Sequence, residues 1–208
     1  MDKLLFTGDF FCSETDSFDF SLLDQELQAL NVSLILNVEG SFSSSVNDID
    51  KWQNIKLAQS QAIFRMPTNS IYYSIYNNHS TDFGKNGLDE LIHAIKKSNT
   101  HFNEFSNVCG FYKKDFKVIF FGDLKENVSC KKLKLDEFNK SSIMKREKYI
   151  KDAIVIIHGG LEYRVDPSPY QRYLSHLLIK LGAKAVIFHH SHVEGKYEVV
   201  DGKIIHYG

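Results

Sequence analysis

The sequence predicts an α/β fold in which a central mixed β-sheet, or a sandwich of two sheets, is flanked by helices. Short apolar strands alternate with amphipathic helices along the chain, and several strands end in residues that can bind a metal. The clearest case is a strand at residues 153–157, a helix at 168–181 and a strand at 185–188. Gly182 follows that helix, as expected at a helix C-terminus. A right-handed crossover between parallel strands places both carboxyl ends at one sheet edge, where such folds bind ligands.

The preceding part of the chain shows the same alternation. We expect strands at residues 3–6, 33–36, 71–76 and 116–121, and helices at 21–30 and 86–98. The polar, serine-rich stretch between residues 41 and 60 predicts a surface loop with a short helix around Trp52. A chain of 208 residues can bury one good core, so the sequence predicts a single domain spanning residues 1–208.

Composition narrows the class of protein. The formal net charge of −1 gives no overall field that would attract nucleic acid. No apolar run approaches the ~20 residues of a membrane span, and the N-terminus shows no basic and apolar leader. The cysteines (Cys12, Cys109 and Cys130) are odd in number and widely spaced, which is typical of reduced thiols. We therefore expect a soluble cytoplasmic protein that binds no nucleic acid and does not span a membrane.

A basic segment at residues 123–151 differs from the rest of the chain. Between Lys125 and Lys151 it carries eight lysines and one arginine against four acidic residues, an excess of five positive charges. Such a run is usually a solvated face of the molecule. The alternative is a basic flap that attracts an anionic substrate.

The polar residues at the predicted strand ends form a recognisable set of metal ligands. They are Asp9, Glu39, Asn78, His79, His158, His190 and His192. Carboxylates, an amide oxygen and imidazoles suit Mn, Fe, Co or Zn better than calcium. Without His79, the two carboxylates, one amide and three imidazoles exceed the needs of one tetrahedral ion and fit a pair of ions about 3.5–4 Å apart. A lone histidine is more often structural, but this many candidates at successive strand ends favours a metal site.

Several motifs resemble those of one family. They are Gly8-Asp9, Asn37-Val38-Glu39-Gly40, NNHSTDFGKNGL from Asn77, HGGLEY from His158, PSPYQR from Pro167 and GAKAVIFHHSH from Gly182. In these motifs the chain resembles the CapA family of bacterial capsule and poly-γ-glutamate synthesis proteins, itself similar to the calcineurin-like metallophosphoesterases. The matches extend over nearly the whole chain. Two blocks are long and specific: HGGLEY continuing through PSPYQR, and GAKAVIFHHSH.

The resemblance implies a metal-dependent hydrolase with phosphoesterase-like chemistry. Its metal ligands would be Asp9, Glu39, Asn78, His158, His190 and His192, which hold one or two divalent ions. His79 would be the acid that protonates the leaving group. Asn77, Glu162 and His189 occupy motif positions of open role and are candidates for substrate binding. The implied substrate is an anionic small molecule or polymer precursor, and a membrane-associated biosynthetic complex is a candidate partner.

The chain also departs from the family pattern. Phe11 stands where the Asp-x-His of phosphoesterases has its histidine, which weakens one metal site. Residues 65–70 are too few for the helix that usually precedes the Asn-Asn-His strand, and the chain ends before the usual Leu-Gly-Asn-Phe, so we expect a trimmed member. Two alternatives stay open: an amide-forming or polymer-releasing enzyme of the same pathways, although no GxxxxGK[ST] loop is present, and a non-catalytic, metal-poor assembly partner.

Overall fold

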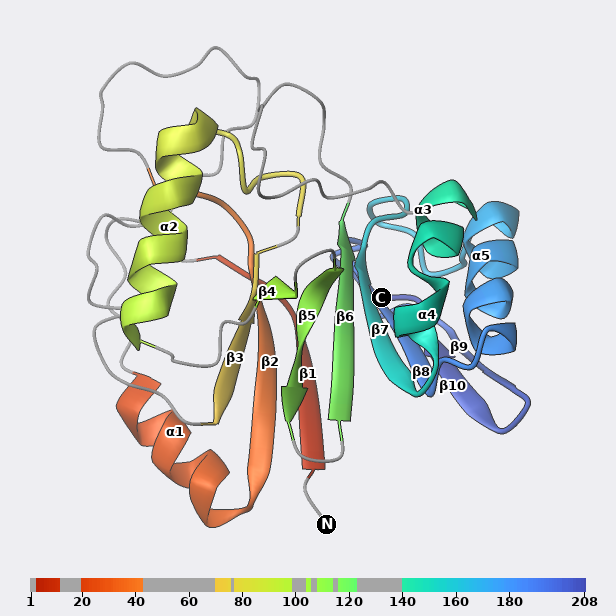
Figure 1. Cartoon of the computed structure of the whole chain (residues 1–208), viewed down its shortest axis with the longest axis horizontal. Coiled ribbons are helices and arrows are strands. Elements are labelled where there is room, and N and C mark those ends of the chain that lie inside the picture. Colours follow the sequence, from red (N-terminus) through yellow and green to blue (C-terminus); the bar gives the residue numbers. More distant parts are fainter. Residues whose placement is uncertain are drawn as a thin grey trace. The chain divides into compact units, whose positions relative to one another are not determined.

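The chain divides into two compact units. The computed structural model describes residues 3–11, 20–42, 70–75, 77–98, 104–105, 108–113, 116–122 and 140–208. Unit 1 consists of Met1–Phe102 with Leu124–Lys134, and unit 2 of Asn103–Asp123 with Leu135–Gly208. Each unit has its own sheet (Figure 1). The α/β class is thereby confirmed, whereas the single domain and the phosphoesterase-like arrangement of the sheets stay predictions.

Unit 1 contains a parallel three-stranded sheet. Its strands are β1 (Lys3–Phe10), β2 (Val32–Val38) and β3 (Ile71–Ser74), in that spatial order. Every residue of β2 after Val32 is buried, as expected for the central strand of a parallel sheet. The helices α1 (Phe20–Ala29) and α2 (Gly84–Ser98) lie beside the sheet (Figure 1).

Specific contacts hold these helices in unit 1. The buried carboxylate of Asp24 on α1 accepts a hydrogen bond from the Ser70 backbone N–H (2.8 Å), which fixes the start of β3. A Cβ atom at Gly87 would lie 2.2 Å from the carbonyl oxygen of Phe42, so only glycine lets α2 approach this closely. Leu88, Leu91 and Ile95 form the buried stripe of α2, at the spacing that predicted the helix.

Unit 2 contains a mixed seven-stranded sheet in the order β4-β5-β6-β7-β8-β10-β9. Its strands are β4 (Glu104–Phe105), β5 (Val108–Lys113), β6 (Phe116–Gly122), β7 (Ala153–His158), β8 (Ala185–His189), β9 (Tyr197–Val200) and β10 (Lys203–His206). The neighbours β6, β7, β8 and β10 are parallel, and β4, β5 and β9 pair antiparallel. The sequence did not predict β4 or β5.

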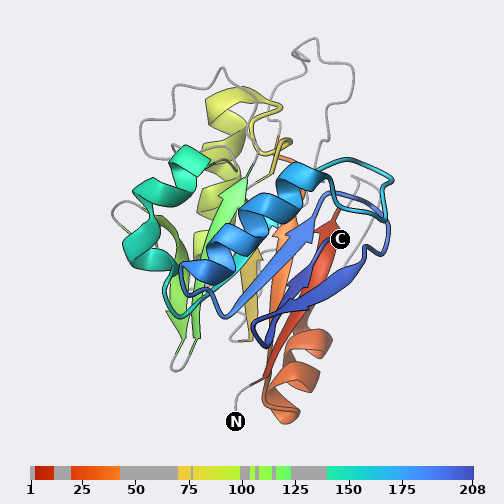
Figure 2. The same ribbon diagram turned by 90° about the vertical axis from the view of Figure 1, so that its right-hand side faces the viewer.

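The helix α5 (Pro169–Lys180) connects β7 to β8 and lies against one face of the sheet (Figure 2). It begins with a capping box: the Ser168 hydroxyl accepts from the Gln171 backbone N–H, and the Gln171 side chain accepts from the Ser168 N–H. Gly182, with φ +96°, follows its end. The predicted strand–helix–strand unit is therefore confirmed, with parallel strands and the expected helix ends.

The basic segment contributes to the core of unit 2, which the sequence did not predict. Two short helices, α3 (Lys140–Lys145) and α4 (Glu147–Ile150), lie within it. Their lysines are exposed, as a solvated face requires, but Ile143 and Ile150 are fully buried. The Arg146 guanidinium lies 5.5 Å from the centroid of the Phe121 ring. Residues 123–139, like the stretch around Trp52, lie outside the described residues.

In the described part of the chain, no helix combines the length and hydropathy that crossing a bilayer requires.

Replacing Ile143 by alanine should lower the free energy of unfolding by about 2–5 kcal/mol, because a buried side chain is lost from the core. Met144→Ala is the matched control, because Met144 follows Ile143 on α3 but its side chain is 43% exposed, against 0% for Ile143. The control should change stability by less than about 0.5 kcal/mol. Urea denaturation followed by circular dichroism measures both, and equal small effects would show that α3 is not anchored in the core.

Candidate functional site

Four histidines gather where β7 and β8 end in unit 2. His158 and His189 are the last residues of these strands and are paired in register, so their rings project from the same face of the sheet. Both are buried, and their Nδ1 atoms lie 2.9 Å apart. The His190 ring centroid lies 4.7 Å from that of His158 and 5.9 Å from that of His192. The predicted convergence of these residues is thus present within unit 2.

Backbone hydrogen bonds join the two loops that follow these strands. The Gly159 N–H donates to the His189 carbonyl (3.1 Å), the Tyr163 N–H to Ser191 (2.6 Å), and the Lys196 N–H to Val165 (3.0 Å). His190, His192 and Tyr163 all have positive φ angles, of 105°, 54° and 56°. Such angles are uncommon outside glycine and persist where surrounding contacts fix them. The loop after β8, which carries His190 and His192, is therefore held in a defined, strained conformation.

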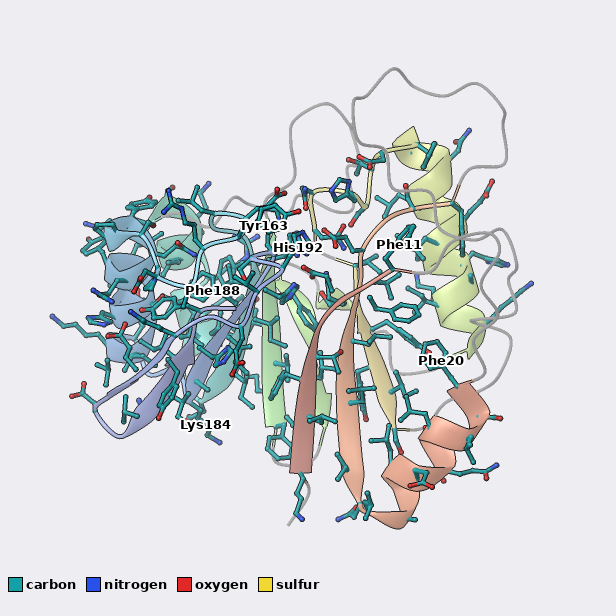
Figure 3. The ribbon with its side chains drawn as sticks, turned by 180° about the vertical axis from the view of Figure 1, so that it is seen from behind. Phe11, Phe20, Tyr163, Lys184, Phe188 and His192 are labelled. Carbon is teal, nitrogen blue, oxygen red and sulfur yellow. The ribbon has the colours of Figure 1, made fainter. Side chains whose placement is uncertain are left out.

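Glu162 joins the histidines to form a set of donors for a metal. One ligand atom each from Glu162, His190 and His192 lie within 4.8 Å of one another. The Glu162 Oε1 atom lies 3.9 Å from His190 Nε2. Tyr163 lies beside His192 (Figure 3), with ring centroids 5.9 Å apart. Two imidazoles and a carboxylate are donors found in catalytic zinc and non-haem iron sites. The residues of unit 2 therefore fit a borderline divalent ion by their chemistry.

In unit 1, Asp9 and Glu39 lie at the ends of β1 and β2. The pairing of these strands shifts between Phe6 and Asp9, a bulge that places Asp9 opposite Asn37. The Asn37 side-chain amide donates to Asp9 Oδ1 (2.7 Å). Glu39 is buried and offers a carboxylate oxygen within 4.8 Å of one from Asp9. Two neighbouring carboxylates repel each other unless a cation or proton lies between them, so this pair also suits a metal.

His79 in the loop after β3 is held by an aspartate that the sequence analysis did not select. Its Nδ1 atom lies 2.7 Å from the buried carboxylate of Asp82, and its Nε2 atom lies 4.0 Å from Glu39 Oε1. An ionised carboxylate only accepts hydrogen bonds, so the Nδ1 atom carries a proton and Nε2 faces Glu39. The three-residue spacing of His79 and Asp82 at a helix start was the signal available in the sequence.

Asn77 organises the same loop. It is fully buried, and its amide nitrogen donates to the Val38 carbonyl (2.7 Å). Its Oδ1 atom accepts from the His79 backbone N–H (3.1 Å) and the Ser80 hydroxyl (3.0 Å). Asn77 therefore ties the loop that carries Asn78 and His79 to the end of β2. Its assignment to substrate binding stays a prediction.

The predicted site residues thus form one group in each unit. Unit 1 holds Asp9, Glu39, Asn77, Asn78 and His79, and unit 2 holds His158, Glu162, His189, His190 and His192. That the two groups bind one pair of ions stays a prediction. Phe11 directly follows β1 and is 50% exposed (Figure 3); its phenyl ring has no lone pair for a metal.

A buried aromatic pair supports the histidines of unit 2. Phe188, which precedes His189, stacks on Tyr207 with ring centroids 5.4 Å apart. The Tyr207 hydroxyl donates to Glu198, and burial together with this bond raises the pKa of Tyr207. Burial alone would raise the pKa of Glu198, but hydrogen bonds from Tyr207 and His176 outweigh it and lower that pKa. Tyr207 thus stays a protonated donor to an ionised acceptor, which fixes its ring behind Phe188.

Comparison with known proteins agrees with the motifs. Residues 123–208, which include the whole histidine group of unit 2, match the family model described as "Bacterial capsule synthesis protein PGA_cap". In these residues the chain is similar to the CapA capsule synthesis proteins. It is 25% identical over 154 residues to the capsule biosynthesis protein CapA of Bacillus anthracis. That match covers 64% of this chain and 38% of the Bacillus protein, so the chain spans well under two thirds of that relative. The resemblance identified from the motifs is therefore confirmed.

Proposed function

We propose that this chain is a metal-dependent hydrolase with phosphoesterase-like chemistry that acts in the synthesis of a bacterial capsule or related surface polymer. The observation that carries the proposal is the convergence of His158, His190, His192 and Glu162 at the ends of β7 and β8. The relationship to capsule synthesis proteins supports the pathway. Poly-γ-glutamate and polysaccharide precursors are both anionic or phosphate-linked candidates for the substrate.

The proposed ligands are His158, His190 and His192 in unit 2 and Asp9, Glu39 and Asn78 in unit 1. Mn, Fe, Co or Zn suits this mixture of imidazole and oxygen donors. A bound ion would lower the pKa of a water molecule and offset negative charge that develops on a phosphoryl oxygen. Asn37 supports this role, because its amide holds the Asp9 carboxylate in place. In unit 2, the backbone hydrogen bonds between the loops after β7 and β8 hold His190 and His192 in place.

His79 is the proposed general acid. A proton on its Nε2 atom would pass to the leaving-group oxygen as the ester bond breaks. Asp82 holds the ring through Nδ1, and Asn77 holds the backbone of His79, so the acid keeps one orientation. Orientation by a second group is what distinguishes catalytic histidines from freely rotating ones.

A second candidate function is a non-catalytic partner in an assembly complex that binds little metal. Phe11 favours it, because the aromatic ring replaces a histidine that phosphoesterases use at this motif position. An amide-forming or polymer-releasing enzyme stays a third prediction, and dependence of turnover on ATP would distinguish it from a hydrolase.

We expect His190→Ala and His192→Ala each to weaken metal binding by at least about tenfold while the fold is retained, because both residues lie on a loop. Elemental analysis after loading with Mn²⁺, Co²⁺ or Zn²⁺ measures the effect, and circular dichroism checks the fold. His93→Ala, an exposed histidine on α2, is the control and should bind metal as the wild type does. Unchanged metal content in both loop variants would refute the ligand assignment.

His79→Asn should retain metal but lose about 10²–10⁴-fold in turnover, because a positioned general acid is removed. The loss should be greatest on phosphate esters with poor leaving groups, which depend on protonation. Asp82→Asn should produce a smaller loss with the same dependence on leaving group. Steady-state kinetics on a series of aryl and alkyl phosphates measures this, and an equal loss across the series would contradict the role.

A further inference from the structure

The contact between His158 and His189 constrains both rings. A neutral imidazole has one N–H and one lone pair, on different nitrogens. Since the two Nδ1 atoms lie 2.9 Å apart, one ring donates from Nδ1 and the other accepts there. The donating ring consequently has its lone pair at Nε2, and the accepting ring has its proton at Nε2. The pair therefore contains one ring suited to coordinate a metal through Nε2 and one ring that is not.

We propose that His189 is a positioning residue: it accepts the Nδ1–H of His158 and so fixes His158 to bind a metal through Nε2. This inference rests on the proposed function. It differs from the substrate-binding role expected from the motif position. His158 is the ligand of the pair because a ligand atom of His158 lies within 4.8 Å of one from His190, and their rings are 4.7 Å apart.

The surroundings of His189 suit a fixed acceptor. The side chain is only 6% exposed, and its ring meets that of His158 edge to face, with centroids 4.9 Å apart. Its backbone carbonyl accepts from Gly159, and the preceding Phe188 is held by its stack on Tyr207. Metal-binding histidines usually donate their second N–H to a carboxylate, carbonyl or water. Here a buried imidazole takes that place.

Two substitutions at His189 separate a hydrogen-bond role from a packing role. In asparagine the Oδ1 atom is as many bonds from Cβ as the histidine Nδ1 atom, so His189→Asn keeps an acceptor. His189→Leu fills similar space without one. Cobalt(II), titrated by its visible absorption, should bind His189→Leu about 10–100-fold more weakly, the usual loss for an outer-shell partner. His189→Asn should stay close to wild type.

Nitrogen NMR of the metal-free protein gives a second readout that does not depend on metal. The His158 ring should show an Nδ1–H tautomer in the wild type and in His189→Asn, and a mixture of tautomers in His189→Leu. Wild-type cobalt affinity in His189→Leu would overturn the inference, as would an equal loss of cobalt in His189→Asn and His158→Asn. If His189→Leu does not fold, the cobalt affinities of His189→Asn and His158→Asn still test whether His189 acts as a hydrogen-bond acceptor.

The reference variant His158→Asn distinguishes this inference from the proposed function. It lacks the Nε2 atom and should lose cobalt. If it binds cobalt like the wild type, the ligand assignment fails and the proposed function fails with it. If His158→Asn loses cobalt but His189→Leu does not, only the role of His189 fails.

Discussion

The parallel pairing of β7 with β8 is the constraint on which the candidate site of unit 2 depends. In-register pairing brings two distant parts of the sequence to one point, with His158 opposite His189 at the last rung. The strands are apolar and buried, so the hydrophobic core fixes their register. A slip of one residue between the two strands would place His158 and His189 on opposite faces of the sheet. The core packing of α5 and the stack of Phe188 on Tyr207 thereby determine where the imidazoles lie.

The sequence was sufficient for the elements that follow simple periodicity. The crossover from β7 through α5 to β8 could be predicted because the apolar runs and the glycine after the helix indicate the same boundaries. The strands β4 and β5 could not, since the first is two residues long and the second includes a glycine. The burial of Ile143 was also missed, because mostly charged residues separate it from Ile150 and no continuous apolar face is visible in the sequence. In that segment tertiary packing outweighs local composition.

In the candidate site, too, some features follow from the sequence pattern and others depend on tertiary contacts. Strand-end positions predicted that His158, His190 and His192 would gather, because the sheet edge alone brings them together. The roles of Asp82 and Asn77 depend on side-chain hydrogen bonds within a loop, which no periodicity reveals. The bulge that sets Asp9 opposite Asn37 likewise needs the pairing register of both strands. The proton shared by His158 and His189 required atomic positions, since it depends on which nitrogens face each other.

The most direct test of the account is the location of a metal in crystals of the full chain. Anomalous diffraction at the absorption edge of zinc or cobalt, after soaking in that ion, would locate it independently of activity. We expect a peak about 2.0–2.1 Å from the Nε2 atom of His158 and from a ring nitrogen of His190, with His192 binding the same ion or a second one. A soaked crystal with no anomalous peak at these histidines, or with a peak only at surface residues elsewhere, would contradict it.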